Sequence, residues 1–98
     1  MTELTDVTAK PMSEADSPAL IEWTDGSAPA LVNSVRVNDN GWLWLRTFDD
    51  RTMRFPPHAV ARIEYAETEW DGDVLEGNKV LSDGVAEQFS GREFEVWG

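Results

Sequence analysis

The sequence has no cysteine and a single histidine, and these two absences exclude several kinds of chemistry. Without cysteine the chain can form neither a disulfide nor a thiolate metal site. A multi-histidine metal centre cannot be built within one chain from His58 alone. The acidic stretch Asp71-Gly72-Asp73 departs from the EF-hand calcium loop, because the required glycine is missing. We therefore expect no catalytic residue, no metal site and no cofactor, and we expect that the protein is not an enzyme.

Long apolar runs are also missing. No stretch is long enough to cross a bilayer, and no basic, apolar segment opens the chain. These absences predict a protein without a transmembrane segment that is not secreted, located in the cytoplasm or in a virus particle.

Positive charge is scarce and unevenly distributed. Eight lysines and arginines stand against 19 acidic residues, for a net charge of −11. Residues 35–62 carry five arginines and three aspartates, whereas residues 1–34 and 63–98 are strongly acidic. The acidity is compatible with solubility alone or with a high-salt, halophilic host, and it is also compatible with a specific binding role.

The most informative stretch covers residues 35–48, which alternate apolar and polar side chains as two strands of a hairpin do. Gly41 can take the left-handed conformation that ends a three-residue loop over residues 39–41. That loop sets Val37 opposite Leu43 and Val35 opposite Leu45 as one apolar face. We therefore expect the arginine and tryptophan side chains of the hairpin to point outward, away from the core.

These outward side chains form the candidate interaction site. The same alternation in the two strands that follow adds further arginines, and Arg36 should lie across from Trp44 in a cation–π contact. Trp70 is included because it lies in the acidic stretch 67–76, which could fold over this surface. The predicted interface residues are Arg36, Trp42, Trp44, Arg46, Arg54, Arg62 and Trp70.

An exposed surface of arginine and tryptophan has three possible uses. The tail with Trp70 could cover it within one molecule, since a small β-protein must hide its aromatics somewhere. It could contact a neighbouring subunit, because tryptophan and arginine are enriched at interface hot spots and the acidic segments are complementary in charge. It could bind single-stranded nucleic acid, although the net charge opposes the approach of a polyanion.

The rest of the chain predicts a mostly β protein. Residues 1–18 read as an extended acidic arm, and residues 19–66 as strands, with one helical turn at His58 and with Ile63 and Tyr65 facing inward. Residues 67–98 read as an acidic loop followed by a short strand, one helical turn and a final edge strand.

The order of elements in residues 19–66 is similar to small SH3-like and Sm-like β-barrels. The segments that carry the similarity are 41–45, 49–56 and 60–63. It implies an all-β fold: a small five-stranded SH3-like barrel or half-open sandwich, with an N-terminal arm and a C-terminal β extension. Such barrels act in peptide binding, nucleic-acid binding and ring assembly, so the similarity does not select among these functions.

We therefore expect a non-enzymatic interaction or assembly module that binds itself or other proteins of an assembly. A connector, tail or decoration protein of a virus particle is one setting that fits. One alternative is an acidic mimic of DNA that presents carboxylates from residues 64–76 to a nucleic-acid-binding protein. The other is a single-stranded nucleic-acid binding module. No small-molecule substrate and no membrane partner are indicated.

Overall fold

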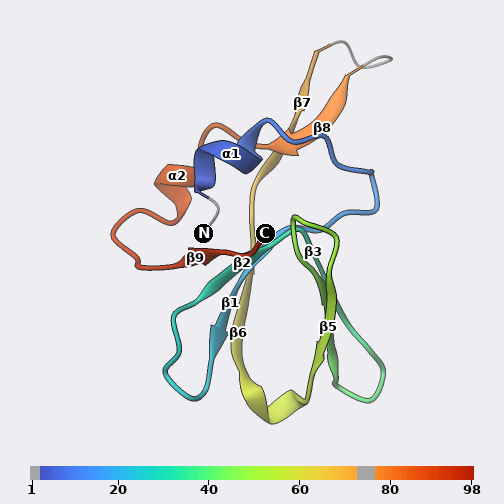
Figure 1. The fold of residues 1–98 in the computed structure, drawn as a ribbon, viewed down its shortest axis with the longest axis vertical. Coiled ribbons are helices and arrows are strands. Elements are labelled where there is room, and N and C mark those ends of the chain that lie inside the picture. The colour runs from blue at the N-terminus through green and yellow to red at the C-terminus, as the bar shows by residue number, and fades with distance from the viewer. Residues whose placement is uncertain (1–2, 73–76) are drawn as a thin grey trace.

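The computed structural model describes residues 3–72 and 77–98, and it shows a mostly β protein with short helices (Figure 1). No helix in these ranges is long and apolar enough to cross a membrane. The strands are β1 (Ala19–Trp23), β2 (Ala30–Val32), β3 (Ser34–Val37), β4 (Leu43–Arg46), β5 (Thr52–Phe55), β6 (Val60–Tyr65), β7 (Thr68–Asp71), β8 (Asn78–Leu81) and β9 (Glu95–Val96). The helical elements are α1 (Leu4–Thr8), the 3₁₀ turn η1 (Pro57–Ala59) and α2 (Val85–Gln88).

The strands form three sheets rather than a closed barrel. One sheet has the order β6-β1-β2-β9, the second β3-β4-β5, and the third β7-β8. Only Asn33 separates β2 from β3, and the chain bends there. β2 belongs to the first sheet and β3 to the second, so this bent segment connects the two sheets. The prediction of an all-β protein is confirmed, and that of a closed five-stranded barrel is not, because the described strands of the first two sheets form no continuous ladder.

The β3–β4 hairpin has the predicted register. Val37 pairs with Leu43, and Arg36 pairs with Trp44. The Asn38 amide donates to the Trp42 carbonyl at 2.9 Å, which closes a three-residue loop that ends at Gly41 with φ 86°. The β4–β5 hairpin repeats this geometry without a glycine: the Thr47 amide donates to the Arg51 carbonyl at 2.8 Å, and Asp50 takes the left-handed position with φ 65°.

The central strands β1 and β2 are buried on both faces, which makes the fold three layers deep. Ile21 and Val32 face the β3-β4-β5 sheet and share a core with its inward side chains. Leu20 and Leu31 face the other way, into a second core. That second core is completed by Phe48 from the β4–β5 loop and by apolar side chains from both ends of the chain: Val7, Met12, Leu81, Val85, Phe89 and Val96.

The N-terminal segment is not the extended arm that the sequence predicts. Leu4–Thr8 forms α1, and its buried Val7 packs in the second core. The Met12 amide donates to the Lys79 carbonyl at 2.8 Å, so this segment also joins β8. The two ends of the chain pack together on one face of the β1-β2 sheet, and this contact supplies the apolar burial that residues 1–18 lack alone.

Two further predictions were wrong. Tyr65 was expected to face inward, but it lies at the end of edge strand β6 and is 53% exposed. The acidic stretch after residue 66 was expected to be a loop, but Thr68–Asp71 forms β7 of a projecting hairpin (Figure 1). Asp73 and Glu76, which belong to the same predicted stretch, lie outside the described residues.

Candidate interaction site

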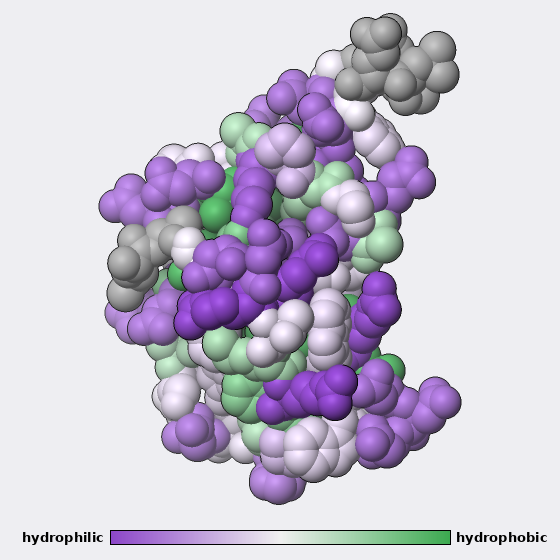
Figure 2. Space-filling view, turned by 45° about the vertical axis from the view of Figure 1, so that its right-hand side comes forward, coloured by the Kyte–Doolittle hydropathy of each residue, from purple (hydrophilic) through white to green (hydrophobic). Residues whose placement is uncertain are grey.

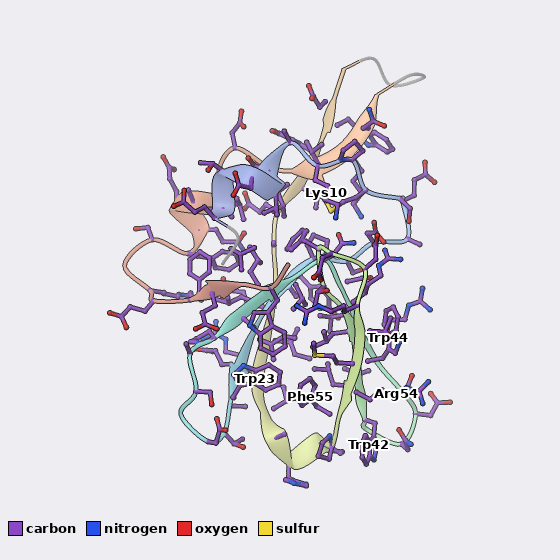
Figure 3. The ribbon with its side chains drawn as sticks, viewed as in Figure 1. Lys10, Trp23, Trp42, Trp44, Arg54 and Phe55 are labelled. Carbon is purple, nitrogen blue, oxygen red and sulfur yellow. The ribbon has the colours of Figure 1, made fainter. Side chains whose placement is uncertain are left out.

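The outer face of the β3-β4-β5 sheet carries an arginine–tryptophan–arginine row. The Arg36 guanidinium lies over the Trp44 ring, 5.4 Å from its centroid, and Arg54 is the direct cross-strand partner of Trp44 on the other side. Trp44 is half-buried between these two exposed arginines, and Figure 3 shows Trp42, Trp44 and Arg54 on the outer side of the sheet. We call Arg36, Trp42, Trp44 and Arg54 the Arg–Trp face.

Trp42 extends this face to the end of the hairpin. It is 41% exposed, and its amide donates to the Asn40 Oδ1 within the loop at 3.1 Å. The preceding Gly41 leaves no room for a side chain, because an added Cβ would lie 3.0 Å from the Pro57 side chain. The loop therefore lies directly against η1 at Gly41, and the hydrogen bond to Asn40 anchors the Trp42 amide.

Two predicted members do not belong to the Arg–Trp face. Arg46 is drawn away by the buried carboxylate of Asp16, with which it forms an ion pair. Arg62 lies on β6 in the other sheet, where it contacts Glu64 at 2.9 Å and Glu22 at 3.7 Å. The alternation is as predicted along β4, and Arg62 on β6 is exposed as predicted although Tyr65 is not inward. In both cases partners elsewhere in the fold decide where the guanidinium goes.

Trp70 does not cover the Arg–Trp face. It lies on β7, is 48% exposed, and pairs across the hairpin with Lys79. This hairpin projects from the end of the molecule that also carries α1 and α2 (Figure 1). The prediction that the tail folds over the face within one molecule is therefore wrong for its described part.

Charge pairing separates the arginines into two groups. Four of the six form ion pairs with carboxylates: Arg46, Arg51, Arg62 and Arg92. Within residues 3–72 and 77–98, neither Arg36 nor Arg54 has such a partner. Figure 2 shows strongly hydrophilic residues next to residues of nearly neutral hydropathy on the surface that is turned forward.

An aromatic cluster that was not predicted from the sequence lies between the first two sheets. Trp23, Phe55 and Trp97 come from three segments, with ring centroids 4.7, 5.6 and 6.4 Å apart. Beside them lies a cavity of about 390 Å³ whose rim includes His58 and Asp25. The signal was present in the alternation, since Trp23 shares the inward face of Ile21. Rings this close pack on one another, so the cluster closes one end of the apolar core.

A shallow depression beside β3 was also missed. Val37 and Tyr65 line it and are each more than half exposed, although they belong to different sheets. β3 pairs only with β4, so the described part of the chain has no strand along its other edge. The depression therefore combines apolar side chains with the open backbone edge of a strand.

The fold and this surface define a small acidic β protein with an exposed Arg–Trp face and open strand edges. No protein-family model, no curated protein and no solved structure matches the chain. Among the described residues no three histidine, aspartate or glutamate side chains gather in a way that could hold a metal ion. The function must therefore be argued from the surface itself.

Proposed function

We propose that this chain is a non-enzymatic protein–protein interaction module that binds acidic protein surfaces through its Arg–Trp face. One observation supports this most directly: Arg36 and Arg54 flank Trp44 and have no carboxylate partner among the described residues, in a chain with 19 acidic residues. Tryptophan and arginine are the side chains that contribute most at protein interfaces. The Arg36 guanidinium already lies over the Trp44 ring, so it loses less side-chain entropy when a partner carboxylate arrives.

The strand order agrees with this role. We propose the finer assignment of residues 19–66 to an SH3-like half-open sandwich, and the bent path from β2 into β3, the two tight hairpins and η1 support it. A repetitive assembly, such as the connector or tail of a virus particle, is one setting for such a module. Self-association is included, because the chain carries acidic surface of its own.

The two alternatives have less support. For a DNA mimic, Glu64 would have to present free charge, but it is neutralised by Arg62 and Arg92, and Asp73 and Glu76 lie outside the described residues. For a nucleic-acid binder, aromatic stacking on Trp42 and Trp44 is available, but a net charge of −11 repels a long polyanion. A short acidic peptide meets less of this repulsion because it carries few charges.

The test uses a short fluorescently labelled peptide of alternating glutamate and tryptophan, and the same peptide with glutamine in place of glutamate as a neutral control. We expect the acidic peptide to bind more tightly in a fluorescence-anisotropy titration at low salt. Arg36→Ala or Arg54→Ala should each weaken binding about five- to tenfold, which corresponds to the loss of one hydrogen bond of about 1 to 1.4 kcal/mol. The matched control is Arg51→Ala, which removes an exposed arginine already paired with Asp49.

Equal binding of the two peptides, or equal affinity of the Arg36, Arg54 and Arg51 variants, would refute the proposal. A labelled oligothymidine that binds more tightly than the acidic peptide, and loses affinity on Trp44→Ala, would support the nucleic-acid alternative instead.

A further inference from the structure

Among the sheet edges in the described part of the chain, those of β3 and β7 lie on different sheets. Within residues 3–72 and 77–98, β3 pairs only with β4, and β7 pairs only with β8. Met12 forms a bridge with Lys79 on the side of β8 that faces away from β7. Among the described residues no other bridge to this hairpin is formed, so the outer edge of β7 has no strand partner. All four residues of β7 are exposed. Exposed edges are templates for pairing with another strand.

The hydrogen-bond pattern shows which backbone groups face each edge. On β3 the bonded pair Asn38–Trp42 sets the alternation, because bonded and non-bonded pairs alternate in an antiparallel ladder. The N–H and C=O of Val37 therefore point away from β4. On β7 the Ser82 amide donates to the Glu67 carbonyl at 2.9 Å, so the N–H and C=O of Trp70 point away from β8 by the same rule.

The hydrogen bond of the Lys79 carbonyl is independent evidence that the backbone of Trp70 points away from β8. It accepts from the Met12 amide at 2.8 Å, so the backbone of Lys79 points away from β7. Lys79 is the cross-strand partner of Trp70, and a non-bonded pair has both backbones turned outward. Val37 and Trp70 thus each present a free donor and a free acceptor at an open edge.

The side chains at these two edges are complementary. Val37 is 57% exposed, Trp70 is 48% exposed, and Tyr65 beside Val37 is 53% exposed. Next to Val37 stands Arg36, and next to Trp70 stands Asp71. Glu69 accepts a hydrogen bond from the Asp83 amide, whereas within the described residues Asp71 makes no side-chain hydrogen bond or ion pair.

We propose that β7 of one copy of this chain adds as an antiparallel strand to the β3 edge of a second copy. Trp70 then faces Val37 in a bonded pair and lies beside Tyr65, while Asp71 faces Arg36 on the outer side of the sheet. This inference rests on the proposed function and names the partner: the acidic surface that Arg36 meets is the β7 strand of the same protein.

The two surfaces of this contact are different, so the assembly is head-to-tail. Each copy uses β3 toward one neighbour and β7 toward the other, which produces rings or open chains rather than a closed two-fold dimer. It also gives the projecting hairpin a role, because β7 lies away from the sheet that carries the Arg–Trp face (Figure 1). The contact would bury three of the four large exposed hydrophobic side chains of the described chain, namely Val37, Tyr65 and Trp70.

The first test measures mass by sedimentation at low salt over a range of protein concentration. We expect the wild-type mass to rise above 11.0 kDa with concentration. Arg36→Glu alone and Asp71→Arg alone should each remain monomeric, and an equimolar mixture of these two variants should recover the increase in mass. The matched control is Asp83→Arg, an exposed acid near β7 that is outside the proposed contact.

A second test examines the backbone. We expect hydrogen exchange at the Val37 and Trp70 amides to slow at least tenfold between dilute and concentrated protein. Val37→Pro should abolish association but keep the fold, because the amide it removes has no partner within its own sheet. Val37→Ala retains that amide and should lose less than Val37→Pro does.

The outcomes separate this inference from the proposed function. If Arg36→Glu lowers the mass and Asp71→Arg does not, the Arg–Trp face binds another surface, and pairing with β7 is wrong. If the wild type is monomeric at every concentration, the inference is refuted, and the acidic-peptide titration alone decides the proposed function. Equal exchange at the Val37 and Trp70 amides in dilute and concentrated samples of an associating protein refutes strand addition.

Discussion

At the scale of single residues, the least ordinary backbone belongs to Asp50. Its φ of 65° places an L-residue in the left-handed region, at the loop position where the preceding hairpin has Gly41. Left-handed geometry costs a side chain about 1 kcal/mol, whereas glycine loses about 0.5 kcal/mol through its freer unfolded state. We therefore expect Asp50→Gly to raise the free energy of unfolding by about 0.5 kcal/mol, measured by urea denaturation.

The control for this substitution is Asp39→Gly in the first hairpin loop. Asp39 is also an exposed turn aspartate, but its φ is not positive. Glycine there brings only the entropic loss, so stability should fall by about 0.5 kcal/mol. If both substitutions raise stability equally, loss of negative charge is the cause, and the geometric explanation of Asp50 is wrong.

Glu64 is a residue whose charge links two parts of the fold. The Arg92 guanidinium, which donates a hydrogen bond at 2.8 Å, and then Arg62 hold the pKa of Glu64 below its usual range. A group with a lowered folded pKa stabilises the protein above its unfolded pKa of about 4.3, and that contribution disappears as pH falls through the folded value. We expect Glu64→Gln to lower the urea midpoint near about pH 7 and to have a vanishing effect in strong acid.

The mechanism is checked in an Arg92→Ala background. There Glu64 has lost its strongest partner, so Glu64→Gln should cost less than it does in the wild type. An undiminished cost in this background would show that Arg92 is not the source of the stabilisation.

At the scale of elements, the segment 13–17 joins two strands from different sheets. Asp16 is buried, binds Arg46 of β4, and accepts the Ser13 amide at 2.8 Å, while its own carbonyl accepts from Lys79 of β8. Asp16→Ala leaves the Arg46 guanidinium without its counter-ion. Because that side chain is 31% exposed, the expected loss is about 2 kcal/mol, less than for a fully buried pair.

The effect of Asp16→Ala should be largest at the N-terminal segment. We expect the Met12 amide, which bonds the Lys79 carbonyl, to exchange faster, and thermal melting to begin at a lower temperature. Glu14→Ala removes an exposed acid from the same segment and should change stability by less than about 0.5 kcal/mol. Equal losses in the two variants would assign the effect to net charge and not to the ion pair between Asp16 and Arg46.

Local elements were predictable because their determinants are local. Strict alternation and Gly41 fixed the register of β3 against β4, and Pro56-Pro57 marked the end of β5. The helix at Leu4–Thr8 was missed because its stability comes from packing Val7 against residues more than 70 positions away, which no short window contains. The strand Thr68–Asp71 was missed for a similar reason: its acids suggested a loop, and its pairing with β8 depends on tertiary context.

The site was predictable only as far as strand alternation extends. Arg36, Trp42, Trp44 and Arg54 lie on one face because each is an even position of adjacent strands in register. Arg46 and Arg62 obey the same alternation, yet carboxylates brought close by the fold withdraw them. Periodicity in the sequence predicts on which side of a sheet a side chain lies. It does not predict the ion pairs of that side chain, because these depend on tertiary structure.

At the scale of the whole molecule, a net charge of −11 opposes both the folded state and self-association, whereas the local contact between Arg36 and Asp71 of two copies favours association. Self-repulsion within one chain is screened by salt, since the Debye length falls from about 30 Å at about 0.01 M to about 8 Å at about 0.15 M. Contact between the Arg–Trp face and acidic β7 is an attraction that the same salt weakens. We expect added NaCl to raise the melting temperature of dilute protein while lowering the mass of concentrated protein.

Measuring both quantities on one salt series makes the comparison decisive. Arg36→Glu should flatten the mass curve by removing the intermolecular attraction, and it should leave the rise of melting temperature with salt in place, since the chain becomes more acidic. If salt instead lowers the melting temperature of the monomer, internal ion pairs such as those of Arg62 and Arg92 outweigh self-repulsion. If mass rises with salt, screening of the repulsion between two chains of charge −11, together with apolar contact through Val37 and Trp70, outweighs the loss of the Arg36–Asp71 attraction, and charge complementarity is not the main source of association.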